Sequence, residues 1–259
     1  MTERSLSVSP SFLAGARLVL ARELQAWFDG AIATVALVAA LLFVLASFMN
    51  EFFVRGRLDM APFFDRLPLV LVLFVPALAM RLWAEDRKLR TFELWMTLPL
   101  TPLQIVLGKY AAALLVYLVF LLGTLPIPIL LFSLGSPDPG PIVAGYLGAL
   151  LLGALFLALG QLLSGFTADQ IVAFLATALA CAFLVATGEP RVVAALDGLS
   201  PAFAPGLAAG TRLSEWVAAL PRFEAFARGS VSLAGLVYFG GLAAIALAAN
   251  AASVARNRT

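Results

Sequence analysis

The stretch that decides the fold is residues 110–164, which read YAAALLVYLVFLLGTLPIPILLFSLGSPDPGPIVAGYLGALLLGALFLALGQLLS. Asp138 is the one charged residue in this stretch, and Pro and Gly residues surround it. The uncharged run on each side is long enough to cross the hydrocarbon core of a bilayer, which takes a helix of roughly 20 residues. A cluster of Pro and Gly is typical of a turn. The stretch therefore predicts two membrane-spanning helices joined by a short connection.

Uncharged apolar windows of this kind recur along the whole chain. A charged residue at the centre of a span costs about 2.5 to 3.5 kcal/mol on insertion scales, so windows without charge indicate spans. The second of six such windows is short, and it reaches span length if the Arg81 guanidinium extends to the interface while Leu82 and Trp83 continue the helix. Six buried helices of a soluble protein are disfavoured, because their outward faces would lack polar residues. The windows are 31–49, 67–80, 110–132, 142–164, 170–187 and 230–250.

The composition favours the same class of protein. Apolar residues make up 62% of the 259 residues and charged residues 12%, whereas soluble domains have about 45 to 50% and about 25%. We therefore predict an all-α membrane protein with six transmembrane helices. Residues 1–30 are expected to form a cytoplasmic N-terminus with an interfacial helix, and residues 31–259 the six-helix transmembrane domain.

Residue types exclude or disfavour several functions. The chain has no His, which removes His-based metal sites and Ser-His or Cys-His nucleophile pairs. Cys181 is the single Cys and lies among apolar residues, so we interpret it as a small buried hydrophobe. A net charge of +2 without a basic stripe gives no indication of nucleic-acid binding. Charged residues within the first 30 positions argue against a cleaved signal peptide. We expect no catalytic residue and no metal site.

Cationic residues outside the windows predict the orientation. With six spans both termini lie on one side of the membrane. That side carries ten of the 17 Lys and Arg residues, five of them on the connection from Arg81 to Lys109. We therefore place both termini in the cytoplasm, and the connections 50–66 and 188–229 outside.

Residues 12–29 predict an amphipathic helix at the cytoplasmic membrane surface. Arg22, Gln25 and Asp29 lie on one face of a helical wheel, whereas Glu23 intrudes on the apolar face and Arg17 lies at its border. A solvated lead-in to the first span is the alternative. The positions of the apolar face are Phe12, Leu13, Ala16, Val19, Leu20, Leu24, Trp27 and Phe28.

The cytoplasmic connection 81–109 predicts two short structural elements. Residues 85–98 form a helix that Pro99 terminates. Thr101, Pro102 and Gln104 then match a capping box with Pro at the first helical position, so a new helix begins here and leads into the third span. The first helix has more apolar surface than a solvated loop needs, although a plain loop is the alternative. Its apolar residues include Phe92, Leu94, Trp95 and Met96.

Three blocks of the chain carry a family resemblance. The most specific lies within residues 80–109 and contains Arg81-Leu82-Trp83-Ala84-Glu85-Asp86-Arg87, Thr91-Phe92-Glu93-Leu94, Leu98-Pro99-Leu100-Thr101 and Gly108-Lys109. The others are Arg22-Glu23-Leu24 with Trp27-Phe28, and residues 221–229 with Tyr238-Phe239. The blocks resemble the membrane permease subunits of type-2 ABC exporters, in the branch that includes gliding-motility and nitrous-oxide-reductase maturation transporters. Asp29-Gly30 replaces a frequent Ser-Pro of that family, and Arg90 replaces its usual Gly.

The resemblance implies a half-transporter membrane domain. Two copies, or one copy with a related permease, would dock two cytoplasmic ABC ATPase subunits. Residues 85–98 would be the coupling helix, and 12–29 the elbow helix that braces it. The chain lacks a Gly-x-x-x-x-Gly-Lys-Ser/Thr phosphate loop, so ATP and Mg would bind to the partner ATPase and this chain would hold no cofactor. The expected coupling residues are Glu85, Asp86, Arg87, Thr91, Phe92, Glu93, Leu94 and Trp95, and the expected elbow residues are Arg22, Glu23, Trp27 and Phe28.

The outside connection 188–229 contains short apolar pieces divided by Pro residues. By analogy with type-2 exporters, short helices here would dip back as an outer gate, and an interfacial cap lying flat is the equal alternative. Non-helical backbone at membrane depth requires cover from protein or a water-filled cavity. Pro126 and Pro128 predict a kink near the outer end of the third span.

The predicted mechanism is mechanical. Closure of the ATPases moves the coupling helix, which changes how the spans pack along the dimer seam. The spans lack a chain of ionisable groups, which favours a lipid-like or bulky substrate, or mechanical work, over an ion path. A non-transporting anchor or mechanotransmission scaffold that acts on an extracytoplasmic partner is the alternative, and a membrane enzyme is disfavoured. The expected location is the plasma (inner) membrane of a prokaryote.

Overall fold

The computed structural model of the chain describes residues 11–29, 31–56, 58–203 and 208–256. These residues form helices and no strand, which confirms the all-α class. The helices are α1 (Phe12–Asp29), α2 (Ala31–Arg55), α3 (Ala61–Ala79), α4 (Arg81–Lys88), α5 (Phe92–Thr97), α6 (Pro102–Gly123), α7 (Pro126–Leu134), α8 (Pro139–Ser164), α9 (Gln170–Ala186), α10 (Pro190–Phe203), α11 (Ala209–Val217), α12 (Leu220–Ala227) and α13 (Leu233–Arg256).

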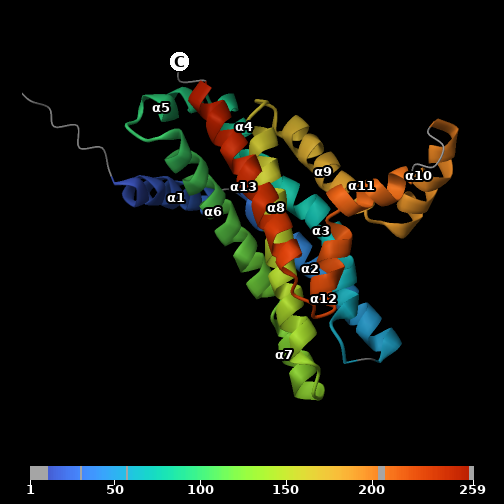
Figure 1. Ribbon diagram of the computed structural model, residues 1–259. Coiled ribbons are helices and arrows are strands. Elements are labelled where there is room, and N and C mark those ends of the chain that lie inside the picture. Colours follow the sequence, from blue (N-terminus) through green and yellow to red (C-terminus); the bar gives the residue numbers. More distant parts are fainter. Residues whose placement is uncertain (1–10, 30, 57, 204–207, 257–259) are drawn as a thin grey trace, which may run out of the picture.

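Five segments of the described chain are long and apolar enough to cross a membrane, and they run along a common direction (Figure 1). α9 and the beginning of α10 are together also long and apolar enough to cross, but the two helices are bent by 82° relative to each other. Against the six predicted spans, the described chain thus has five candidate spans, or six if the bent pair counts as one. The five are Thr34–Val54, Ala61–Lys88, Pro102–Leu134, Pro139–Ser164 and Leu233–Arg256.

The connection between α2 and α3 is shorter than the predicted connection over residues 50–66. α2 continues to Arg55 and α3 begins at Ala61, so only residues 56–60 connect them. The prediction of a connection over 50–66 was wrong, because it excluded charged residues from the helices. Arg66 instead donates through Nη2 to Glu51 Oε2 at 2.9 Å, and this ion pair ties the two helices together.

α8 lies at the centre of the bundle, where it contacts α3, α6, α9, α12 and α13 (Figure 1). Small residues on α8 admit large neighbours. At Gly153 the Tyr117 ring fills the space, since an added Cβ would lie 2.2 Å from the ring carbon Cζ. The Tyr117 hydroxyl donates to the Ala149 carbonyl at 2.6 Å. Close approach at small residues is a usual source of helix association in membranes. Cys181 is completely buried in this core, as predicted.

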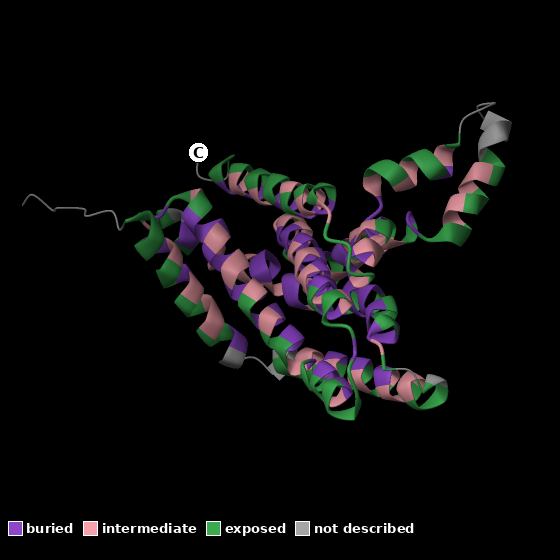
Figure 2. Cartoon of the chain, turned by 60° about the horizontal axis from the view of Figure 1, so that its bottom comes forward, coloured by how far each residue is buried: buried purple, intermediate pink, exposed green. Residues whose placement is uncertain are grey.

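A helical hairpin interrupts the segment that begins with α9. α10 and α11 project from the side of the bundle, and exposed and intermediate residues prevail along them (Figures 1 and 2). Directly before α12, the Ala219 N–H donates to the Leu184 carbonyl at 2.9 Å, so α12 resumes where α9 ends. Gly229, which follows α12, lies beside Pro141 at the beginning of α8. The connection 188–229 is thus largely helical, and its role as gate or cap stays a prediction.

The third predicted span contains the break that its prolines suggested. α6 ends at Gly123, and α7 begins at Pro126. Pro126 and Pro128 both lie in the first turn of α7, where a missing backbone N–H leaves no helical hydrogen bond unmade. The predicted kink thus corresponds to a short break between two helices.

Candidate functional site

Four elements meet at the end of the bundle that carries α5, which we call the α5 end. α1 lies across the first turns of α6, and α4 continues the direction of α3 (Figure 1). The predicted capping box sets the beginning of α6: the Gln104 N–H donates to Thr101 Oγ1 at 3.3 Å, and the Thr101 N–H donates to Gln104 Oε1 at 2.7 Å. Gln104 Nε2 also donates to the Phe12 carbonyl at 3.3 Å, which attaches α1 to the same cap.

α1 packs closely on α6 because Gly108 has no side chain. An added Cβ at Gly108 would lie 2.6 Å from Val19 Cβ and 2.8 Å from the Ala16 carbonyl oxygen. The amphipathic helix predicted over 12–29 is confirmed, with Val19 and Trp27 buried on its inner face. Its inner face also carries Glu23, the residue that intruded on the apolar side of the helical wheel.

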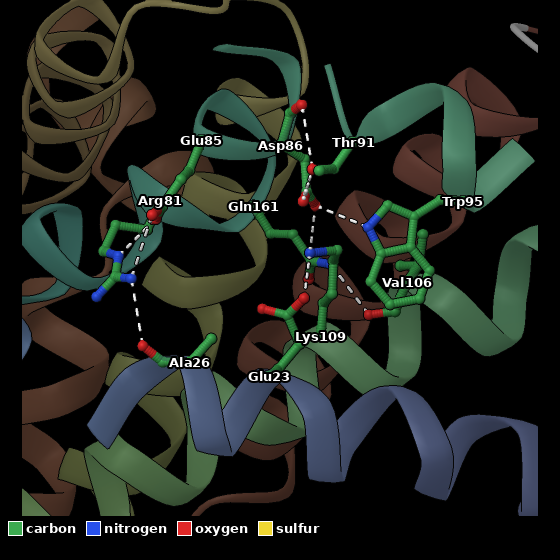
Figure 3. A network of polar contacts seen from close by, with 10 residues as sticks. All are labelled: Glu23, Ala26, Arg81, Glu85, Asp86, Thr91, Trp95, Val106, Lys109 and Gln161. Carbon is green, nitrogen blue, oxygen red and sulfur yellow. Dashed lines mark hydrogen bonds and ion pairs between the residues drawn. The ribbon is translucent and has the colours of Figure 1, made fainter. Parts of the chain in front are cut away.

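Glu23 lies on the inner face of α1 because it pairs with the buried Lys109. The Lys109 side chain is 1% exposed, and Nζ forms ion pairs with Glu23 Oε1 at 2.5 Å and with Asp86 Oδ2 at 2.7 Å (Figure 3). The rings of Trp83 and Trp95 each lie 5.1 Å from Nζ. A buried ammonium is stable only when it is paired and enclosed in this way. We call these five residues, Glu23, Trp83, Asp86, Trp95 and Lys109, the Lys109 hub.

Asp86 also holds α5 in place. Thr91 Oγ1 donates to Asp86 Oδ1 at 2.7 Å, and Trp95 Nε1 donates to Asp86 Oδ2 at 3.1 Å (Figure 3). The guanidinium of Arg22, from α1, lies 4.4 Å from the centre of the Trp95 ring. Lys109 and Arg22 therefore both place a cation against Trp95, which is 2% exposed. Each contact joins α5 to a different helix.

The chain turns sharply between α4 and α5. α4 ends at Lys88, and Arg90 has a φ of 58°, in the left-handed region that favours Gly. The single helix predicted over 85–98 was therefore wrong: its first half belongs to the long segment Ala61–Lys88, and its second half is α5. The sequence has a helical pattern across this turn and therefore did not predict it. The contacts of Asp86 that hold α5 form only by tertiary packing. The family's usual Gly fits this backbone conformation.

Arg81 joins α4 to α1. Its Nε donates to Glu85 Oε2 at 2.7 Å, its Nη2 donates to the Ala26 carbonyl at 3.4 Å, and its guanidinium lies 5.4 Å from the centre of the Trp27 ring. The side chain is 13% exposed. Arg81 thus reaches α1. The helical segment Ala61–Lys88 continues past Arg81, as predicted. A polar cavity of about 150 Å³ lies between α1 and α4, lined in part by Arg22, Arg81 and Glu85.

The structure divides the sequence-predicted site residues into two groups. Arg22, Glu23, Trp27, Glu85, Asp86, Thr91 and Trp95 come together around the hub. Arg87 lies over the Phe92 ring at 4.5 Å, and Phe92 packs edge-on against Trp83. Glu93 and Leu94 face away from the hub, and Leu94 is 52% exposed. The side chain of Phe28 lies outside the described residues.

Sequence reasoning missed the central residue of this site. Lys109 was counted among the cations of the connection 81–109 and noted in a Gly-Lys pair, and Trp83 was noted as an extension of the second span and within the resemblance block. Neither was expected to be a site residue. The signal was present, since an acidic residue on the apolar face of α1 requires a buried cation as partner. The sequence could not show which of several cations on the α5 side supplies it.

The geometry defines a multi-span helical membrane protein whose surface helix and short α5 are locked to the spans by buried charges. A family model described as ABC-2 family transporter protein matches residues 63–207, more than half of the chain, and the chain belongs to this family. The match covers α4, α5 and Lys109 but not α1. No curated protein matches the sequence. The family is a membrane component of transporters, so the chain is not their catalytic part.

Proposed function

We propose that the chain is the permease subunit of an ABC transporter and couples ATP hydrolysis by a separate ATPase subunit to export or conformational work. Two copies, or one copy with a related permease, make the transport unit. ATP and Mg bind to the ATPase. Membership of the ABC-2 family supports the membrane part of this proposal.

The convergence of three chain segments on Lys109 carries the proposal. Nζ connects α6 to α1 through Glu23 and to α4 through Asp86, and Asp86 in turn holds α5 through Thr91 and Trp95. A movement imposed on α5 therefore reaches the spans α3 and α6 directly, because α4 continues α3. Rigid elements linked by buried polar contacts are a suitable route for such coupling.

The turn before α5 and the outward face of α5 together supply a docking surface, which we define as Leu89, Arg90, Glu93 and Leu94. Leu89 is 64% exposed and Leu94 52% exposed, beside two exposed charges. A cleft of about 280 Å³ adjoins it, and Phe166 from the turn between α8 and α9 contributes to its lining. Apolar anchors with charged neighbours are typical of protein interfaces. Trp95 is buried and Asp86 half-buried behind this surface, so they position it for the ATPase.

The orientation and location follow from the docking role. The α5 end, with both termini, faces the cytoplasm, and the membrane is the plasma (inner) membrane of a prokaryote. The branch of gliding-motility and nitrous-oxide-reductase maturation permeases is the nearest fit to the Arg81–Arg87 block. The lack of a chain of ionisable groups along the spans favours a lipid-like or bulky substrate.

The experiment changes the docking surface and measures the partner. We expect Glu93→Arg combined with Leu94→Asp to lower recovery of the co-purified ATPase about tenfold, because interface anchors carry most of the binding energy. Stimulation of ATP hydrolysis by the permease should fall in parallel.

The matched control is Glu189→Arg combined with Leu199→Asp. Glu189 is exposed and Leu199 is 60% exposed, at the base and on the side of the projecting hairpin. This variant should bind and stimulate the ATPase as the unchanged chain does. Unaltered recovery and unaltered ATP hydrolysis in the α5 variant would contradict the proposal.

A further inference from the structure

An open apolar groove lies where the projecting hairpin joins the bundle. It has a volume of about 630 Å³ and is lined by Leu159 of α8 and by residues of α9, α11 and α13. On α13 the lining extends from Val237 to Ile245, a length of roughly 12 Å at the rise of a helix. Trp216, from the last turn of α11, stands at the groove and is 79% exposed. The volume lies within the range of roughly 300 to 1,000 Å³ that ligand pockets occupy.

The groove lies at membrane depth. α13 is one of the segments that are long and apolar enough to span, and the lining begins four residues, roughly 6 Å, inside its end at Leu233. α12 extends beyond the base of the hairpin toward Gly229 and the beginning of α8. With α13 as a span, the groove would face the acyl region of the leaflet at the α7 end.

A cation at the rim has no carboxylate partner among the described residues. The Arg222 guanidinium lies 4.1 Å from the centre of the ring of Tyr238, which lines the groove. Its Nη1 donates to the Ala218 carbonyl at 2.5 Å, and its Nη2 donates to the Glu215 carbonyl. The Tyr238 hydroxyl donates to the Val217 carbonyl. Backbone carbonyls and a ring leave the positive charge of Arg222 without a counter-ion, which is costly at membrane depth. An anionic group from outside the chain would therefore stabilise it.

We propose that the groove binds one acyl chain of an anionic phospholipid, whose phosphate pairs with Arg222. A second copy of the chain does not fit as well, because a helix with its side chains is about 10 to 12 Å across. A helical piece as long as the groove would fill about 1,000 Å³, more than the groove provides. A single extended hydrocarbon chain is narrow enough, and the lipid headgroup supplies the missing negative charge.

Brominated lipid provides the direct test. Trp216 is at the groove, whereas Trp27, Trp83 and Trp95 are buried near the α5 end. The fluorescence difference between the unchanged chain and Trp216→Phe therefore isolates Trp216. We expect phosphatidylglycerol with brominated acyl chains, titrated into the purified chain in detergent, to quench Trp216 saturably. Unbrominated phosphatidylglycerol should reverse the quenching.

A pair of adjacent glycines supplies a matched variant and control. Gly241 lines the groove, Gly240 does not, and an added Cβ at either meets no atom within 4 Å. Gly241→Leu should fill the groove and weaken the saturable quenching at least about tenfold, since a filled pocket excludes the chain. Gly240→Leu should bind as the unchanged chain does. Arg222→Gln should weaken phosphatidylglycerol binding about tenfold and abolish its preference over brominated phosphatidylcholine, because a hydrogen bond to a charged group is lost.

Three results would overturn the proposal. Quenching that rises in proportion to brominated lipid, without saturation and equally in Gly241→Leu, would mean that only bulk lipid reaches Trp216. Equal affinity of Arg222→Gln and the unchanged chain for phosphatidylglycerol would remove the phosphate contact. A loss of dimer in native mass spectra of Gly241→Leu, with quenching unchanged, would assign the groove to a second copy. Circular dichroism of each variant verifies that it is folded.

Discussion

Lys109 is surrounded by two carboxylates and two tryptophan rings, and its side chain is 1% exposed. Its removal leaves Glu23 and Asp86 buried without a cation. Breaking a buried ion pair from one side costs about 3 to 5 kcal/mol. We therefore expect Lys109→Met to lower the free energy of unfolding by about that amount, measured by denaturation of the purified chain.

A charge-free version of the same cluster is the control for Lys109→Met. Combining it with Glu23→Gln and Asp86→Asn removes all three charges while the shapes are nearly kept. Because buried ion clusters replaced as a whole often cost little, this triple variant should regain most of the lost stability. A triple variant as unstable as Lys109→Met would mean that packing of the Lys stem, and not charge, holds the cluster.

A substitution at Arg90 should raise the free energy of unfolding, in contrast to Lys109→Met. Its φ of 58° costs an L-residue about 1 to 2 kcal/mol, whereas Gly adopts this conformation readily. Arg90→Gly should stabilise the chain by about 0.5 to 1 kcal/mol, part of the gain being offset by the larger entropy of Gly in the unfolded state. Thermal unfolding in one detergent measures it. Arg90→Ala, which removes the charge and keeps the Cβ, should give no such gain.

At the scale of elements, the seat of α1 on α6 depends on Gly108. A Cβ there meets Val19 and the backbone of Ala16 at less than 3 Å, so Gly108→Val must displace α1. Overpacking of this kind costs about 1 to 3 kcal/mol. We expect faster amide hydrogen exchange in α1, with exchange in α8 unchanged. Gly198→Val, where an added Cβ meets nothing within 4 Å, should leave α1 protected.

The sequence predicted those structural elements whose causes are interactions between residues close together in the chain. The helix 12–29, the capping box at Thr101 and the kink near Pro126 were predicted because their causes lie within a few residues. The turn at Arg90 escaped prediction, since the contacts of Asp86 with Thr91 and Trp95 compete with a continuous helix only in the folded chain. The extra length of α2 and α3 escaped for a similar reason, because the ion pair of Arg66 and Glu51 joins two helices.

At the scale of the whole molecule, the hub and the groove lie on different parts of one bundle. α8 and α13 pass both, since they run from the α7 end to the α5 end. Uncharged windows predicted the five long apolar helices and α9, whereas the hairpin inserted between α9 and α12 left no periodic signal. A hydrogen bond between Ala219 and Leu184, 35 positions apart in the sequence, joins the beginning of α12 to the end of α9. The sequence alone does not indicate that these two residues are in contact.

The orientation of the molecule is tested by labelling from outside. Cys181 is completely buried, so the unchanged chain should not react with a membrane-impermeant maleimide. Glu93→Cys places an exposed thiol at the α5 end, and Ser133→Cys places one on α7 at the opposite end. If the α5 end is cytoplasmic, Ser133→Cys reacts in intact cells and Glu93→Cys reacts only after permeabilisation. The reverse pattern would place α5 outside, beyond the reach of any cytoplasmic ATPase, whereas the lipid groove would then lie in the inner leaflet with its chemistry unchanged.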